Sequence, residues 1–217
     1  MKSRSALGAV LFTGIAATIC AKPSQAANLA DFDSLTEGFY PTLTSGGVTF
    51  SNLDDFTPLT PTDLFAIDNA TPDLNGISGY SPPNVLGFNG FGPGEGVVFT
   101  RLGSFDFATG SQASSASLVW IAFDNAAGST LELQGIRNGN VVNSASINLN
   151  TTFQITSMTL SLGPGTYDSF KVVAHGTTQD GAVFGVIDNV TVNPVPEPAA
   201  LGALVVAMVI VPRRRRR

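Results

Sequence analysis

The sequence predicts an all-β protein, a β-sandwich of the jelly-roll type with a helical segment at each end. Three observations lead to this prediction. Residues 27–193 contain short runs of β-branched and aromatic residues, and glycine, asparagine, aspartate and proline separate these runs. The same stretch contains no convincing run of apolar residues at helical spacing. Each end has a continuous apolar stretch near basic residues, which predicts an N-terminal signal helix and a short C-terminal apolar helix.

The first 26 residues have the three parts of a secretory signal peptide. Lys2 and Arg4 form a basic start, residues 6–19 are apolar, and Ser24 and Ala26 are the small residues that a signal peptidase recognises. We therefore expect signal peptidase to cleave after Ala26. The alternative, an N-terminal membrane anchor, is disfavoured because the apolar run is short for a membrane span.

Three segments in the middle of the chain have the strongest strand patterns. Residues 117–123 are apolar on both faces, which predicts a central strand that is covered on both sides. Residues 130–136 and 141–149 flank Asn138-Gly139, a dipeptide that favours a two-residue turn between antiparallel strands. We expect a β-hairpin there.

The remaining strands are expected at 153–162, 169–175 and 183–192, with turns at Pro164-Gly165 and Asp180-Gly181. The first of these segments changes the parity of its apolar residues, which are Phe153, Ile155, Met158, Leu160 and Leu162. A change of parity within a strand indicates an extra residue, so we expect a β-bulge near Thr156-Ser157.

Residues 51–96 are rich in proline, glycine, asparagine and aspartate, and we expect a long irregular insert there. Four aromatic residues are scattered through it: Phe65, Tyr80, Phe88 and Phe91. If these rings were exposed, they could stack on sugar rings. The favoured interpretation is that they hold the insert against the sandwich.

The charge of the central part excludes a nucleic-acid partner. Residues 27–193 carry 12 aspartates, 3 glutamates and 3 bases, a net charge of −12, whereas phosphate contacts require clustered lysine and arginine. Aspartate is a frequent ligand of hard cations, although a solvated acidic surface explains most of these residues. The only cysteine, Cys20, lies in the signal segment, so the mature domain has no disulfide and no catalytic thiolate.

The sequence contains no pattern typical of an active site. A nucleophilic serine on a G-x-S-x-G elbow is absent, and so are a phosphate loop and a dinucleotide motif. His175 is the only histidine, and at the end of an apolar strand we interpret it as a surface residue. A pair of carboxylates for glycoside cleavage stays open as an alternative, because 15 acids offer many pairs.

The last 24 residues have three distinct parts. Pro196-Glu197-Pro198 comes first, residues 199–211 are apolar or glycine, and five arginines follow Pro212. As a helix, thirteen residues reach about 20 Å, whereas the hydrocarbon core of a membrane is about 30 Å thick. The run is therefore suited to transient insertion, with the arginines held on the cytoplasmic side.

This C-terminal pattern closely resembles the PEP-CTERM sorting signal. The resemblance covers residues 194–217 and depends on Pro196, Glu197, Pro198, Arg213, Arg214, Arg215, Arg216 and Arg217. It implies recognition by an exosortase, removal of the tail, and delivery to the cell surface or an extracellular matrix. Pro212 departs from the usual pattern, in which the arginines follow the apolar run directly.

Asp188 stands out in the last predicted strand. It shares its parity with Phe184, Val186, Val190 and Val192, so it faces the core if that face is the core face. A buried carboxylate needs a partner or takes up a proton, and with only three bases in the domain a cation is a reasonable partner. The alternative is that the strand ends at Ile187 and Asp188 begins a solvated turn.

The central part also weakly resembles carbohydrate-binding β-sandwich modules. The residues that carry this resemblance are Asp31-Phe32-Asp33, residues 47–50 and residues 186–190. The resemblance implies a structural calcium ion shared between the ends of the domain, with Asp31, Asp33, Asp188 and Asn189 as ligands.

Together these observations predict a signal peptide at 1–26, a β-sandwich at 27–193 and a sorting signal at 194–217. We expect a non-enzymatic protein of the cell surface or matrix that associates with extracellular polysaccharide. The alternative is a secreted hydrolase that acts on glycans. The expected partners are signal peptidase, an exosortase and a polysaccharide, with transient membrane association through the C-terminal helix.

Overall fold

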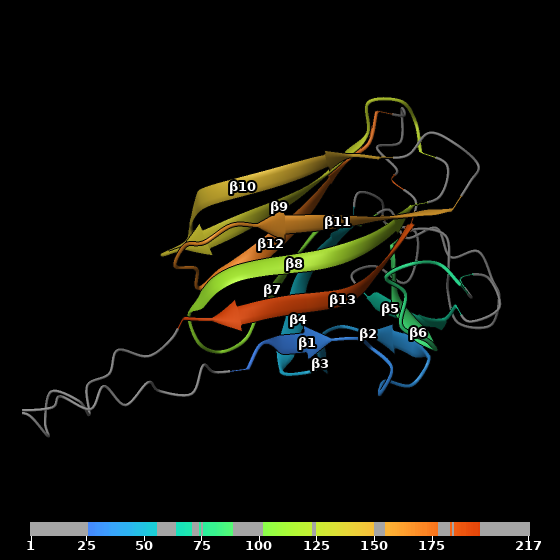
Figure 1. Ribbon diagram of the computed structural model, residues 1–217, viewed down its shortest axis with the longest axis horizontal. Coiled ribbons are helices and arrows are strands. Elements are labelled where there is room, and N and C mark those ends of the chain that lie inside the picture. Colours follow the sequence, from blue (N-terminus) through green and yellow to red (C-terminus); the bar gives the residue numbers. More distant parts are fainter. Residues whose placement is uncertain are drawn as a thin grey trace, which may run out of the picture. The chain divides into compact units, whose positions relative to one another are not determined.

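Two antiparallel sheets face each other in the computed structural model, which makes this part of the chain a β-sandwich (Figure 1). The structure describes residues 26–55, 64–70, 74, 76–88, 102–122, 125–149, 155–177, 183 and 185–195. These residues belong to one compact unit, Gln25–Pro196. The described residues contain no helix that is long and apolar enough to cross a membrane.

The first sheet has β8 and β13 in its interior, side by side in Figure 1. Its strands, in spatial order, are β11 (Thr156–Leu162), β8 (Ala113–Ala122), β13 (Gly185–Pro194), β6 (Asn84–Phe88), β5 (Phe65–Asn69) and β2 (Gly38–Tyr40). The short strand β1 (Asn28–Ala30) pairs with β13, so the beginning and the end of the described chain lie together in one sheet.

The second sheet has β10 and β3 at its two edges and β9 and β12 side by side in its interior. Its strands, in spatial order, are β10 (Asn140–Asn148), β9 (Thr130–Arg137), β12 (Ser169–His175), β7 (Leu102–Ala108), β4 (Val48–Asp55) and β3 (Leu43–Ser45). Because sheet side chains alternate between faces, β9 and β12 each bury every second residue between the sheets.

Aromatic rings fill the space between the sheets. Phe50 contacts four other rings, among them Phe105 and Phe107, whose centroids lie 6.1 and 5.8 Å away. A second, smaller apolar cluster covers the outer face of the first sheet and includes Ile121 and Val186. The neighbours Trp120 and Ile187 belong to the main core. For residues 117–122 this confirms the prediction of a central strand with two apolar faces, whereas Phe123 lies outside the described residues.

Several predicted elements are confirmed with small shifts of their bounds. The hairpin is β9 and β10, and Asn138 and Gly139 have the positive φ values of 51° and 76° that a type I′ turn needs. Strand 169–175 is β12, and the predicted strand 183–192 is β13.

The predicted bulge near Thr156-Ser157 is wrong. Strand β11 begins at Thr156 and pairs with β8 in an unbroken register through Leu162. Ile155 precedes the strand and packs against the smaller apolar cluster, so the change of parity marks the start of the strand. A bulge occurs instead in β10, between Val141 and Asn143.

The prediction of an irregular insert at 51–96 is also wrong. This stretch contains β5 and β6, which belong to the first sheet, and most of β4. Phe65 is fully buried in the main core, and Tyr80 packs against the smaller cluster. Both rings hold their segments in place, so the favoured interpretation of these two residues is confirmed. The side chains of Phe88 and Phe91 lie outside the described residues.

The two predicted terminal segments lie outside the described residues. This applies to the signal helix, to the apolar C-terminal helix and to the whole sorting motif from Pro196 onward. The predicted turn at Asp180-Gly181 also lies outside them, as does Phe184.

Candidate functional site

Asp188 lies where strand β13 changes its neighbour. Residues Gly185–Ile187 pair with β6, and residues 190–192 pair with β1. Both pairings use the same edge of β13, opposite to β8. Between these two pairings the register against β8 shifts, and Asn189 takes a positive φ of 48°. The Asp188 side chain is fully buried at this junction.

The carboxylate of Asp188 accepts hydrogen bonds on both oxygens. The backbone N–H of Ser81 donates to Oδ2 at 2.7 Å, and the backbone N–H of Asn189 donates to Oδ1 at 2.7 Å. The Ser81 hydroxyl lies 3.1 Å from Oδ2. The amide of Asn189 donates to the carbonyl of Gly79 at 2.7 Å, so the pair Asp188 and Asn189 fixes the segment 79–81 to β13.

Of the two interpretations of Asp188, the solvated turn is wrong, because the strand continues to Pro194 and the side chain is buried. Burial raises the pKa of Asp188 to about 7, although the hydrogen bonds from Ser81 and Asn189 oppose this. The negative charge of Asp33 adds to the rise. The carboxyl therefore exchanges its proton near neutral pH.

The other predicted calcium ligands lie in the segment after β1. Asp33 Oδ1 accepts the backbone N–H of Asn84 at 3.2 Å, and Asp31 Oδ1 accepts the backbone N–H of Asp33 at 3.3 Å. Burial raises the pKa of Asp33; the bond from Asn84 opposes the rise, and the charge of Asp31 adds to it. Within the described parts of the chain, no three acidic, histidine or cysteine side chains are grouped to hold a metal ion. Calcium at Asp31, Asp33, Asp188 and Asn189 stays a prediction.

His175 is a surface residue, as the sequence indicated. Its ring lies 3.1 Å from Glu132 Oε2, and its side chain is half exposed. Burial acts to raise the pKa of Glu132, but the bonds from His175, Ser144 and Gln134 outweigh it and lower that pKa. The pair lies on the outward faces of β9 and β12.

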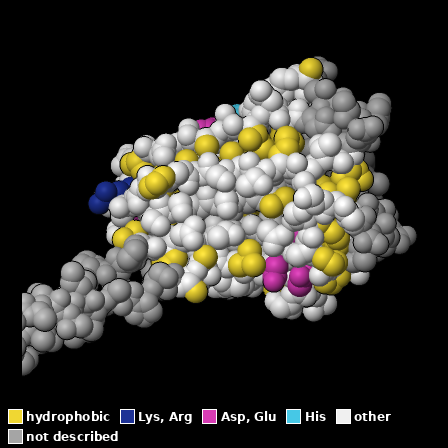
Figure 2. Space-filling view, viewed as in Figure 1, with side chains coloured by type: hydrophobic (Ala, Val, Ile, Leu, Met, Phe, Trp, Pro, Cys, Tyr) yellow, Lys and Arg dark blue, Asp and Glu magenta, His cyan; other side chains and the backbone are white. Residues whose placement is uncertain are grey.

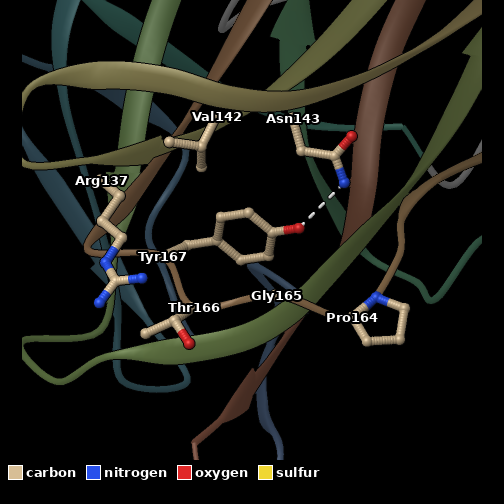
Figure 3. Close-up of a pocket in the computed structure, with 7 residues that line it drawn as sticks. All are labelled: Arg137, Val142, Asn143, Pro164, Gly165, Thr166 and Tyr167. Carbon is tan, nitrogen blue, oxygen red and sulfur yellow. Dashed lines mark hydrogen bonds between the residues drawn. The ribbon is translucent and has the colours of Figure 1, made fainter.

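A pocket of about 270 Å³ opens at the end of the sandwich where β9 turns into β10 (Figure 3). Its walls come from two segments, the β9–β10 hairpin and the connection between β11 and β12. The lining residues are Arg137, Val142, Asn143, Pro164, Gly165, Thr166 and Tyr167. The walls thus combine an apolar surface with a guanidinium, an amide and a hydroxyl group.

The hairpin side of the pocket is shaped by the bulge in β10. Val141 pairs with Ile136 and Asn143 pairs with Gly135, so Val142 is the extra residue between them. A bulge redirects the side chain of its extra residue, and the side chain of Val142 is exposed at the pocket.

The opposite wall is fixed by backbone hydrogen bonds to neighbouring strands. The N–H of Gly165 donates to the carbonyl of Ser114 at 2.8 Å, and Tyr167 exchanges two bonds with Ala113 at 2.8 and 2.9 Å. The N–H of Asp168 donates to the carbonyl of Ile136 at 2.8 Å. The segment 165–168 is therefore held in one conformation, and the pocket is preformed.

The ring of Tyr167 lies beneath the pocket, between two glycines. A Cβ atom on Gly135 would lie 2.4 Å from the ring, and one on Gly165 would lie 2.3 Å from it. The hydroxyl of Tyr167 donates to the carbonyl of Gly163 at 3.0 Å and accepts the amide of Asn143 at 3.1 Å (Figure 3). The ring is 1% exposed, so it supports the pocket from below and offers no stacking surface.

The electrostatics of the pocket depend on Arg137 and Asp168. The N–H of Asn138 donates to Asp168 Oδ2 at 2.7 Å and the amide of Gln112 donates to Oδ1 at 3.2 Å. These two bonds lower the pKa of Asp168, and the charge of Arg137 lowers it further. The guanidinium of Arg137 makes no hydrogen bond or ion pair with any described residue.

Comparisons with solved structures find low similarity. The K1 cleaved adhesin domain of Lys-gingipain from Porphyromonas gingivalis W83 is 13% identical, with a TM-score of 0.43, over 79% of this chain and 100% of that domain. TmCBM61, solved with β-1,4-galactotriose, is 12% identical, with a TM-score of 0.34, over 65% of this chain and 91% of its own.

A carbohydrate-binding module of lichenase 5A from Cellvibrio mixtus, solved with cellotriose, is 13% identical, with a TM-score of 0.24. It covers 80% of this chain and 100% of its own. No protein-family model matches the chain, and no curated protein is significantly similar to it in sequence. Similarities this low assign no function to the chain.

The sequence did not indicate this pocket, although it indicated both turns that border it. Asn138-Gly139 and Pro164-Gly165 were each predicted as local features. The two segments meet because β12 pairs with β9, which places Ser169 opposite Ile136. That pairing joins residues 33 positions apart, and no local pattern in the sequence encodes it.

Proposed function

We propose that this chain is an exported, non-enzymatic protein that binds polysaccharide outside the cell through the pocket between the β9–β10 hairpin and residues 163–167. The observation that carries the proposal is the composition of that preformed pocket. Val142 and Pro164 supply apolar contact, and Arg137, Asn143 and Thr166 supply groups that hydrogen-bond to hydroxyls. Sugars present both kinds of surface, an apolar ring face and a rim of hydroxyls.

The size of the pocket fits a short ligand. Its volume of about 270 Å³ is near the lower end of the ~300–1,000 Å³ typical of ligand sites. A pocket of this size that opens to solvent accommodates one sugar ring of a longer chain. The hydrogen bonds that fix residues 165–168 lower the entropic cost of binding, because these groups are already ordered.

The alternative, a glycan hydrolase, requires two carboxyl groups placed about 5–10 Å apart around the sugar. The seven residues that line this pocket include no aspartate and no glutamate. Asp168 is adjacent and accepts hydrogen bonds from Asn138 and Gln112, but it is one carboxyl group, and no second one lines the pocket. The lining therefore favours binding over cleavage at this place.

Other parts of the proposal extend beyond the pocket. The order β6–β13–β8–β11 in one sheet, opposite β7–β12–β9–β10 in the other, supports a jelly-roll class for the sandwich. We include in the proposal a signal peptide at 1–26 and exosortase processing at the 194–217 tag, based on their sequence patterns. Mass spectrometry of protein recovered from the cell surface tests both, since full-length chain there would contradict them.

Binding is tested with the purified protein on immobilised polysaccharides. We expect Thr166→Ala to weaken binding about fivefold, since one net hydrogen bond is worth about 1 kcal/mol. Thr44→Ala is the matched control and should bind as the wild type does. Thr44 is exposed on β3, and β3 and β10 are the two opposite edges of the second sheet. Wild-type protein that retains no polysaccharide, or that releases sugar from one, would contradict the proposal.

A further inference from the structure

The pocket contains a positive group, the Arg137 guanidinium, that forms no ion pair with a described residue, although the Asp168 carboxylate lies within its field. Arg137 is exposed at the end of β9, and its guanidinium has no hydrogen-bonding or ion-pair partner among the residues that the structure describes. Figure 2 shows a small basic patch at the end of the molecule where β9 and β10 turn, whereas the larger acidic patch lies beside β2. Residues 27–193 carry only 3 bases against 15 acids, so a base that lines a pocket is an uncommon feature here.

The position of Arg137 is held by the turn that follows it. The bond from the Asn138 N–H to Asp168 fixes the residue next to Arg137, and the type I′ turn fixes the end of the strand. The Asp168 carboxylate accepts the Asn138 N–H and the Gln112 amide and makes no hydrogen bond with the Arg137 guanidinium, so the guanidinium donors are available to a ligand.

We propose that the pocket selects an acidic sugar, whose carboxylate pairs with Arg137 while its hydroxyls bond to Thr166 and Asn143. This inference rests on the function proposed above and adds the class of sugar. A planar guanidinium binds a carboxylate through two parallel N–H···O bonds, a geometry that a neutral hydroxyl does not match. The Asn143 amide already donates to Tyr167, which leaves its carbonyl oxygen to accept from a sugar hydroxyl.

The charge of the remaining surface sharpens this selection. A domain with a net charge of −12 in residues 27–193 repels an acidic polymer at most places. The pocket at Arg137 is a place where a carboxylate gains a close positive partner. This repulsion disfavours weak binding of an acidic polysaccharide at other places on the surface, so the polysaccharide binds at this end of the sandwich.

The inference is tested with two oligosaccharides that differ only in charge, a glucuronic acid trimer and a glucose trimer, and with the exported protein as cells release it. We expect wild-type protein to bind the acidic trimer about tenfold or more tightly than the neutral one. Arg137→Gln should remove this difference, with a large loss in binding of the acidic trimer and only a small loss, about that of one neutral hydrogen bond, in binding of the neutral trimer. Arg137→Lys should retain part of the difference, because it keeps the charge and loses the two-point geometry.

Lys171→Gln is the matched control, since it removes the same charge from β12, away from the pocket. An equal loss for Lys171→Gln and Arg137→Gln would assign the preference to overall charge and overturn the inference. Equal binding of both trimers by wild-type protein would overturn it and leave the proposed polysaccharide binding intact. Binding of neither trimer nor polymer would overturn both. If a peptide with a free C-terminal carboxylate binds more tightly than the acidic trimer, the partner is a peptide and the inference is overturned.

Discussion

At the scale of single residues, Asp188 shows how far parity in a strand predicts an environment. Its place among valines predicted burial, and the structure confirms burial. The predicted shared face is wrong, because the register against β8 shifts after Asp188. Val186 therefore packs in the smaller outer cluster, whereas Val190 and Val192 pack in the main core. The partners of Asp188 were not predictable, because Ser81 lies 107 residues earlier in the chain. The Ser81 donor reaches this carboxylate through a contact between distant parts of the chain. The sequence pattern therefore predicts the burial of the carboxylate and does not predict its hydrogen-bond donors.

We expect the metal-free domain to lose stability as the pH rises from about 4 to about 7. Asp188 has a pKa near 3.8 when unfolded and about 7 when folded, so between these values only the folded state holds the proton. The extra stability is complete below pH 4 and is lost as the pH rises through 7, at most about 1.4 kcal/mol per pH unit.

Melting curves in chelator at pH 4 to 8 measure this effect as the difference between wild-type protein and Asp188→Asn. The asparagine has one acceptor oxygen for two backbone donors, so we expect it to destabilise the domain by about 1–3 kcal/mol. The difference should shrink as the pH rises. Asp54→Asn, on an exposed carboxyl of β4, is the control. A difference that is constant with pH would show that Asp188 does not hold the proton.

At the scale of elements, local signals predicted the turns and missed the short strands. Asn138-Gly139 fixed the hairpin because the conformation of a two-residue turn depends on its own residues. Strands β5 and β6 have five residues each and lie between segments rich in proline, glycine and aspartate. Their pairing with each other and with β13 supplies the stability that their sequence pattern lacks.

We expect Gly135→Ala to destabilise the domain by about 1–3 kcal/mol and to weaken ligand binding, because the new methyl group overlaps the Tyr167 ring. The ring has no room to move, since Gly165 and Phe170 contact it from other sides. Gly163→Ala is the matched control, because a Cβ there meets no atom within 4 Å. Denaturant unfolding measures both variants, and equal stability of the two would show that the tight packing of Tyr167 has no energetic role.

At the scale of the whole molecule, the sequence predicted two stacked sheets and a closing strand, and it did not predict which strands meet. The first and last strands, β1 and β13, pair directly, so the ends of the domain are joined by backbone hydrogen bonds. This pairing explains why Asp33 lies near Asp188. Strand β1 leads the chain into the segment that contains Asp33, and this segment runs toward the junction in β13. The sequence placed these acids at opposite ends of the domain and gave no distance between them.

The prediction of calcium belongs to this scale, since the ion would tie Asp31 and Asp33 to Asp188 and Asn189. The charge of Asp33 raises the free-energy cost of ionising Asp188, and a divalent cation would relieve that repulsion. A cation that binds only the folded state stabilises it by about 2.7 kcal/mol at a hundredfold excess over Kd. For a domain of this size that corresponds to about 5–10 °C in Tm.

We therefore expect chelator at pH 8 to lower the Tm of wild-type protein, calcium to restore it, and Asp188→Ala to melt at the same temperature with and without calcium. The test is run at pH 8 because Asp188 is then ionised, so proton and cation do not compete for it. Asp54→Ala is the control and should keep the calcium response, because Asp54 lies in β4 of the second sheet and Asp188 lies in β13 of the first. A wild-type melting curve that is the same in chelator and in calcium would reject the ion. Among the described residues, the donors of Ser81 and Asn189 would then be the partners of the ionised carboxylate.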